Sequence, residues 1–348
     1  MKNCTVNITS QNNSMHGVYN NSTCTTNLVG CDFNFVSAIQ AVGIYIAANG
    51  QGIMTDCSLV ISAKTTYSVY NSGNVCITGC KILESATNYA YGICSQGEAT
   101  VIDLDINASA DNDAACGLYN FGVATVDNCE IKTSSSAGTA YGILNQNNVT
   151  ATECNISAYS NYGSEGGNYT CLAIGISNNG TATLTNCYVM GVHSAVSDHG
   201  TLTVNGGTYE GYGHGGFYLS HANETYYIQN ATIRQCAMPE GYVDNGAETN
   251  NAAMYIGGGS DTTNIKVYMD NCNLYGTGNT IVLRGTNGEN NNTLYISNST
   301  ITGNRWRAVR IDNNTHKLYI GVGCNIGASD ASIPEVVTIT DEVYALAS

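Results

Sequence analysis

Side chains that could carry acid and base chemistry are concentrated between residues 198 and 234, where three of the six histidines lie. An imidazole beside a carboxylate can act as a general acid or base, and it can also hold a metal ion. No His-x-His or His-Glu-x-x-His spacing is present, so the sequence predicts neither a metal site nor a cofactor. The alternative is that these are loop residues of two irregular repeats. The candidate catalytic residues are Asp198, His199, Glu210, His214, His221 and Arg234.

A second group of residues favours ligand binding rather than catalysis. Seven of the eleven basic residues lie between Arg234 and Lys317, although the net charge of the chain is −15. Arginine forms forked hydrogen bonds, and an aromatic ring offers a face to a sugar. The alternative is local neutralisation of an acidic surface. The candidate ligand-binding residues are Arg284, Trp306, Arg307, Arg310, Tyr212, Tyr218 and Tyr242.

Composition excludes several classes of partner. Nucleic acid is disfavoured because backbone binding needs many Lys and Arg residues, and this acidic chain has only eleven. No run of eighteen apolar residues is present, so we expect no membrane span. Charged residues make up 11% of the chain, which disfavours helices stabilised by ion pairs. A carbohydrate or another host-surface ligand is the expected partner.

A four-residue motif, such as Asn128-Cys129-Glu130-Ile131, recurs roughly every 27 residues and positions these candidate residues. Related copies contain Cys4, Cys31, Cys57, Cys80, Cys154, Cys187, Cys272 and Cys324. Degenerate copies carry Leu104, Gly207, Ala231 and Ser299 at the cysteine position. A fixed period of this length is typical of a solenoid.

Two further short strands are predicted in each repeat. One resembles Tyr141-Gly142-Ile143 and the other Ala124-Thr125-Val126, and both alternate with period two between Gly and Asn turns. The sequence therefore predicts an all-β, single-stranded right-handed parallel β-helix of about 12–13 rungs, each with three short strands. Residues 1–327 form the repeats, and residues 328–348 form a C-terminal closing segment of the same domain.

Equivalent residues of stacked rungs should form ladders along the solenoid. Small thiols suit an inward ladder, because cysteine is among the most buried residue types. We expect six cysteines to form one mostly reduced column, namely Cys31, Cys57, Cys80, Cys129, Cys154 and Cys187. A second ladder of hydrogen-bonded amides is expected at Asn20, Asn71, Asn120, Asn145 and Asn178.

The repeats resemble the pectin-lyase-like superfamily of right-handed parallel β-helices, particularly the Gly- and Asn-rich repeats of surface and virion proteins. The resemblance covers nearly the whole chain and implies the fold. It implies no single activity, because the superfamily includes polysaccharide lyases, glycosidases, phage tailspikes and adhesins. No tight Asp-Asp pair of the glycosidase kind is present, since Asp103 and Asp105 fit solvated loop charges better.

These observations favour a non-catalytic binding or structural module of a surface, secreted or virion protein that recognises glycan or a host surface. The alternative is a polysaccharide lyase or glycoside hydrolase. The expected location is extracellular, on a cell surface or on a virion. The repeat is already in register at Asn3, so we expect either a fragment of a longer protein or an end that associates with another copy. Insertions at residues 159–169 and 237–251 are predicted to project as loops.

Overall fold

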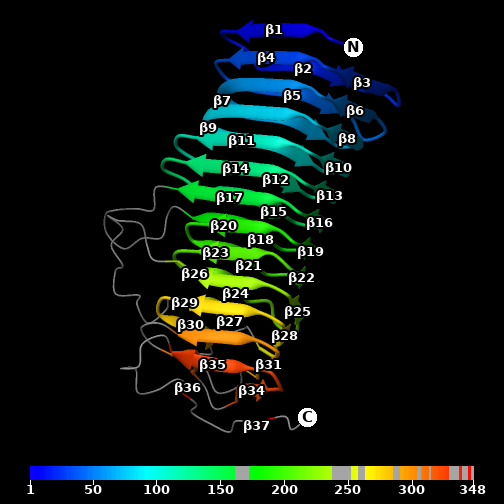
Figure 1. Ribbon diagram of the computed structural model, residues 1–348. Coiled ribbons are helices and arrows are strands. Elements are labelled where there is room, and N and C mark those ends of the chain that lie inside the picture. The colour runs from blue at the N-terminus through cyan, green and yellow to red at the C-terminus, as the bar shows by residue number, and fades with distance from the viewer. Residues whose placement is uncertain are drawn as a thin grey trace. The chain divides into compact units, whose positions relative to one another are not determined.

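A computed structural model describes residues 1–160, 172–236, 252–257, 263–284, 291–303, 307–312, 315–328, 337–338 and 344–345. Within these ranges every assigned element is a strand and none is a helix (Figure 1). The predicted all-β fold is confirmed, because parallel strands stack as a β-solenoid of about 11 turns. The sequence predicted 12–13 rungs, and the third ladder is a sheet of 13 strands. The chain falls into two units, Met1–Ile176 and Ser177–Ser348.

Each turn contributes one strand to each of three ladders in the first unit. The first ladder contains β1 (Thr5–Ser10), β4 (Asp32–Ser37), the N-terminal parts of β7 (Ser58–Asn71) and β9 (Lys81–Ser95), β11 (Asp105–Ala110), β14 (Glu130–Ser135) and β17 (Asn155–Ser160). The second contains β2 (Met15–Asn20), β5 (Gln40–Ile46), the C-terminal parts of β7 and β9, β12 (Ala115–Asn120) and β15 (Ala140–Asn145). The third contains β3 (Thr25–Val29), β6 (Gln51–Thr55), β8 (Asn74–Thr78), β10 (Glu98–Ile102), β13 (Val123–Asp127) and β16 (Asn148–Thr152).

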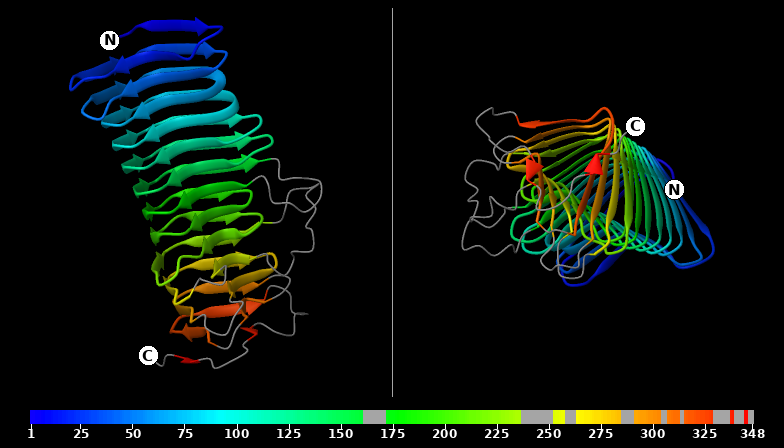
Figure 2. Two further views of the ribbon diagram at one scale, coloured as in Figure 1. Left: turned by 180° about the vertical axis from the view of Figure 1, so that it is seen from behind. Right: turned by 90° about the horizontal axis from the view of Figure 1, so that it is seen from below.

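The second unit repeats the three ladders after β18 (Ala173–Asn178), which contains the unit boundary. Its first ladder contains β20 (Tyr188–Gly191), β23 (Thr208–Gly211), β26 (Thr232–Gln235), β29 (Asn273–Gly276), β32 (Thr300–Gly303) and β35 (Asn325–Ala328). Its second contains β21 (Ser194–Asp198), β24 (Gly215–Leu219), β27 (Ala252–Ile256), β30 (Asn279–Leu283), β33 (Val309–Ile311) and β36 (Val337–Thr338). Its third contains β19 (Thr181–Thr185), β22 (Thr201–Asn205), β25 (Thr225–Gln229), β28 (Lys266–Asp270), β31 (Thr293–Ser297), β34 (Lys317–Ile320) and β37 (Tyr344–Ala345). Figure 2 shows the neighbouring strands of each ladder side by side from two further directions.

The corner between the third and first ladders explains the Asn-Cys motif. The residue before the cysteine has a left-handed backbone, with φ of 52° at Asp56 and 50° at Asn128. Asn, Asp and Gly tolerate this conformation better than other residues do. The thiol then donates a hydrogen bond to the carbonyl two residues earlier, as from Cys57 Sγ to Thr55 O at 3.3 Å. Each motif therefore forms a turn that is closed by a hydrogen bond from its own cysteine.

The glycine of the second strand is required by the aliphatic residue that ends the motif. A Cβ atom on Gly142 would lie 2.3 Å from Ile156 Cγ2 and 2.5 Å from the carbonyl oxygen of Gly175. Contacts this short do not occur between real carbon atoms, so any side chain would displace the strand or the isoleucine. The first and second ladders of the first unit pack directly against each other at this contact between Gly142 and Ile156.

The predicted cysteine column is buried. The six expected members are 0–3% exposed, and the amide of Cys57 donates to Cys80 Sγ at 3.3 Å across one rung. None of the fourteen cysteines in the described part of the chain forms a disulfide, while Cys171 lies outside it. Burial raises the pKa of Cys80 to about 12 and that of Cys272 to about 11. Such thiols are poor nucleophiles, because the thiolate is the reactive form.

We expect thiol counting to reflect this burial. In denaturant, most of the fifteen cysteines should titrate as free thiols with a chromogenic disulfide reagent. In the folded protein the exposed Cys24 should react quickly and the buried column slowly, because burial disfavours the thiolate. Finding most cysteines oxidised in the denatured, unreduced protein would contradict a thiol column.

The amide ladder is present as stacked side-chain hydrogen bonds. Asn120 Nδ2 donates to Asn145 Oδ1 at 2.8 Å and to the carbonyl of Asn148 at 2.8 Å, and its Oδ1 accepts from the Gly122 amide at 3.2 Å. Neighbouring rungs are thus joined inside the corner after the second ladder.

Candidate functional site

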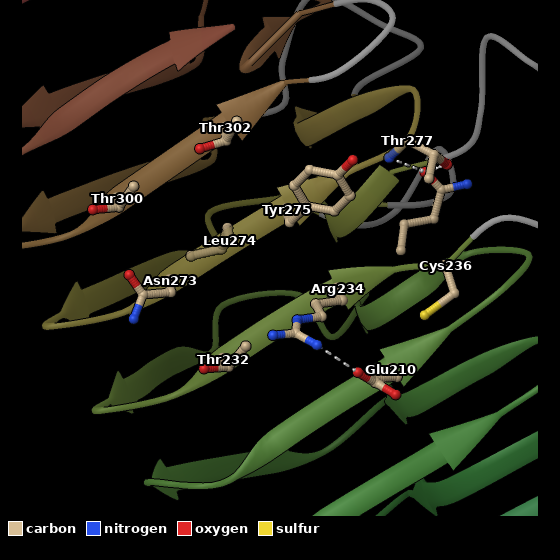
Figure 3. A pocket seen from close by; sticks show the side chains of 11 residues that line it. Glu210, Thr232, Arg234, Cys236, Asn273, Leu274, Tyr275, Thr277, Thr300 and Thr302 are labelled. Carbon is tan, nitrogen blue, oxygen red and sulfur yellow. Dashed lines mark hydrogen bonds and ion pairs between the residues drawn. The ribbon is translucent and has the colours of Figure 1, made fainter. Parts of the chain in front are cut away.

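A groove of about 660 Å³ lies along the outer face of the first ladder in the second unit (Figure 3). Four strands form it, β23, β26, β29 and β32, which pair in parallel and in register. Because side chains alternate along a strand, Ile233 points into the core while Arg234 points out. The lining residues are Glu210, Thr232, Arg234, Gln235, Cys236, Asn273, Leu274, Tyr275, Thr277, Thr300 and Thr302.

The register arranges the outward residues in two columns. Glu210 pairs with Arg234, Arg234 with Tyr275 and Tyr275 with Thr302, so four different side chains follow one another along the groove. A parallel column contains Thr232, Asn273 and Thr300. Residues up to 41 positions apart in sequence, such as Arg234 and Tyr275, therefore lie on adjacent rungs, about 4.8 Å apart.

An ion pair forms one end of the groove, as Figure 3 shows. Arg234 donates to Glu210 Oε1 at 3.1 Å, and the hydroxyl of Tyr188 donates to Glu210 Oε2 at 2.8 Å. The Arg234 side chain is 51% exposed and that of Glu210 is 17% exposed. An ion pair this exposed contributes little to stability. The pair uses Arg234 Nη1, so other N–H groups of the guanidinium can donate hydrogen bonds to an oxygen of a ligand.

The other groove residues that the structure describes are uncharged. Tyr275 is 38% exposed and lies between Arg234 and the hydroxyl of Thr302. At the corner, Gln235 Oε1 accepts hydrogen bonds from the hydroxyl and the amide of Thr277 at 2.7 and 3.1 Å. This end of the groove is fixed by satisfied polar contacts. An aromatic ring, an amide and several hydroxyls beside one guanidinium suit a ligand rich in hydroxyl groups.

The predicted catalytic residues do not gather at one place. Asp198 lies inside the second unit, where Asn178 Nδ2 donates to Oδ1 at 2.5 Å and the Gly200 amide donates to Oδ2 at 3.1 Å. It occupies an amide-ladder position. Burial raises the pKa of Asp198, and hydrogen bonds oppose part of this effect. Its surroundings are those of a structural ladder residue.

His199 and His221 lie at the corner after the second ladder, where the charge of His221 acts on His199, whereas His214 lies at the corner before that ladder. His199 Nδ1 hydrogen-bonds Ser220 Oγ, and His221 Nδ1 lies 3.5 Å from Glu224 Oε1. His214 packs against His193 with ring centroids 4.3 Å apart. Burial lowers the pKa of His214 to about 4, with a smaller contribution from the charge of Arg284. Of the six candidates, only Glu210 and Arg234 line the groove.

The predicted ligand-binding residues fall mainly on another face. Tyr218 pairs with Tyr255 on the outer side of the second ladder, and the charge of Arg284 acts on both rings. On the next rungs Val282 pairs with Arg310, whose Nε donates to Asp312 Oδ1 at 2.6 Å. Other candidates lie elsewhere: Arg307 and Tyr212 at strand ends, and Trp306 and Tyr242 outside the described residues.

Asn273, Tyr275 and Thr302 are among the nine groove residues that were missed from sequence. Their signal was available in the repeat, because each follows a motif's cysteine position by one or three residues. Aligning the repeats by that position places Glu210, Arg234 and Tyr275 in one column. Nearness along the chain groups the charged residues differently.

Within the residues described, no three His, Cys, Asp or Glu side chains come close enough together to hold a metal ion. The same part of the chain contains no helix of the length and apolar character needed to cross a membrane. No protein-family model and no curated protein sequence matches this chain.

Proposed function

We propose that this protein is a non-catalytic carbohydrate-binding module of the pectin-lyase-like β-helix type, and that the groove of the second unit holds the glycan. The column of Glu210, Arg234, Tyr275 and Thr302 carries this proposal. It combines charged donors and acceptors with an exposed ring and hydroxyls, the mixture that recognises a sugar's polar and apolar surfaces. The groove volume lies within the roughly 300–1,000 Å³ typical of ligand sites.

Binding without catalysis is favoured over polysaccharide cleavage. Glycosidases generally use two carboxylates that flank the scissile bond. Among the described residues of the lining Glu210 is the one carboxylate, and both of its oxygens are engaged by Arg234 and Tyr188. A lyase would need a base, and a guanidinium keeps its proton in proteins. An extracellular, cell-surface or virion location belongs to the same proposal and rests on the resemblance of the repeats.

We expect Tyr275→Ala to weaken glycan binding by roughly 1–3 kcal/mol, because the variant removes the exposed ring of the groove. A glycan array followed by titration of the best ligand would measure this. Tyr268→Ala is a matched control, since Tyr268 is 36% exposed but lies on the third ladder. Equal losses in the two variants would show that the groove is not the binding site.

A reducing-end release assay on the same bound glycan separates the two functions. The binding module should release no new reducing ends above the buffer blank. Release that Glu210→Gln abolishes would instead identify an enzyme that uses this carboxylate, and it would overturn the non-catalytic proposal.

A further inference from the structure

A smaller hollow of about 210 Å³ lies on the outer face of the second ladder in the first unit. Its lining residues are His16, Gln40, Val42, Tyr45, Tyr67 and Tyr70. The register explains why it exists. His16 pairs with Val42, Val42 with Tyr67 and Tyr67 with Tyr91, so one small valine interrupts a column of rings.

The walls of the hollow are aromatic and meet at steep angles. The ring of His16 stands at 89° to that of Tyr45, with centroids 6.1 Å apart. Tyr67 stands at 77° to Tyr70, with centroids 5.7 Å apart. Tyr45 and Tyr70 are nearly parallel, at 11°. Rings on several sides of a small space form a box, whereas a sugar ring stacks best on a flat platform.

The dimensions favour a compact group. His16 and Tyr67 are two rungs apart, which is about 10 Å along the axis. Subtracting one aromatic contact thickness of about 3.5 Å leaves roughly 6 Å between the two side chains. The hollow is also smaller than the roughly 300–1,000 Å³ of sites for larger ligands.

Charge decides the class of ligand. None of the lining residues that the structure describes is Asp, Glu, Lys or Arg, so an anion would find no ionic partner among them. The ring faces are electron-rich, and the whole protein carries a net charge of −15. Both features attract a cation that is too weakly hydrated to resist desolvation. Boxes of aromatic rings bind such cations through their faces.

We propose that this hollow is an aromatic cage that binds a quaternary ammonium group. Val42 forms its floor. Tyr67, whose other face stacks on Tyr91, provides a ring face for the methyl groups of the cation, and the stacked rings of Tyr45 and Tyr70 line one side. The Gln40 amide at the rim can bond a hydroxyl or ester oxygen next to the cation. This site is independent of the glycan groove, because all of its residues belong to the first unit.

Tetramethylammonium and choline are the probes, titrated into the full chain at pH 8 and followed through the ¹H resonance of their N-methyl groups. Both should bind, and ring currents should shift that resonance upfield. The neutral isostere 3,3-dimethylbutan-1-ol should bind at least about tenfold more weakly, because only the cation gains from the ring faces. Equal binding of the isostere, or no binding of either cation, would overturn the proposal.

Two variants locate the site. Val42→Tyr should abolish binding by restoring the interrupted column, and it should fold because tyrosine suits an outer strand position. Tyr67→Ala should weaken binding about tenfold. Tyr227→Ala, which removes a 50% exposed tyrosine of the second unit, should change nothing. Choline binding that survives in folded Val42→Tyr would place the cation elsewhere. Glycan binding should persist in that variant, so the two proposals can fail separately.

Discussion

Replacing Asn120 by alanine should destabilise the fold by roughly 3–5 kcal/mol. The side chain is fully buried, and its amide donates to Asn145 Oδ1 and to the carbonyls of Gly122 and Asn148. Its oxygen also accepts from the Gly122 amide. Alanine would leave the Gly122 amide without this acceptor and remove a donor from three oxygens, at a place where water cannot reach them, and each buried polar group left unpaired costs about 1–3 kcal/mol. Urea unfolding followed by circular dichroism would measure the loss.

Asn147→Ala is the matched control for this variant. Asn147 lies on the same corner, but its side chain is exposed and donates one hydrogen bond, to the Phe121 carbonyl at 3.2 Å. Its removal should cost well under 1 kcal/mol. If the two variants were equally stable, the amide ladder would contribute nothing beyond an ordinary surface contact.

Glu84 should make the protein less stable at alkaline pH. Its side chain is 1% exposed and points into the core from β9, where Oε1 accepts from the Tyr91 amide at 3.1 Å and Oε2 has no hydrogen-bond partner. Burial raises the pKa of Glu84 to about 7, although the nearby hydroxyls of Thr66 and Ser68 oppose the shift. The folded state therefore binds this proton more tightly than the unfolded state does.

The sign and size of the effect follow from proton linkage. Below the unfolded pKa of about 4.5 the carboxyl is mostly neutral in both states and has little effect on stability. Between that value and pH 7 the free energy of unfolding falls progressively, because the unfolded state releases the proton more readily. The loss reaches about 3 kcal/mol, at 1.36 kcal/mol per pKa unit. Glu84→Gln should therefore stabilise the protein by up to about 3 kcal/mol at pH 8 and by less than about 1 kcal/mol at pH 4.5.

Urea unfolding of wild type and Glu84→Gln at both pH values tests this linkage. Glu98→Gln controls for the change in net charge, because Glu98 is an exposed residue of the same unit, and it should show little pH-dependent difference. A difference between Glu84→Gln and wild type that did not vary with pH would mean that the carboxylate is not desolvated.

The fold could be predicted because the same alternation of inward apolar and outward polar residues recurs in every repeat. Alternation within each strand placed residues such as Ile131 in the core and Glu130 outside. The left-handed backbone before each cysteine was not anticipated, although the Asn, Asp and Gly at that position carry the signal. Glu84 was also overlooked. Its alternation in Lys81-Ile82-Leu83-Glu84 places it inward, but composition alone suggests that an acidic residue is exposed.

The candidate site was less predictable, because a solenoid brings together residues one whole turn apart. Arg234 and Tyr275 lie on neighbouring rungs although an insertion separates them in the chain. Nearness in sequence instead grouped Asp198 with Glu210, which point to the inside and outside of the second unit. The Arg284 and Arg310 face stays a prediction, and it competes with the groove as the glycan site.

Titration calorimetry with one array-selected oligosaccharide can locate the glycan site by comparing two double variants. Arg234→Ala with Tyr275→Ala alters the groove, and Arg284→Ala with Arg310→Ala alters the other face. If the groove is the glycan site, the first pair should weaken binding at least about a hundredfold and the second by less than about threefold, with both proteins folded. The reverse pattern would contradict the account and move the site to the arginine face of the second ladder.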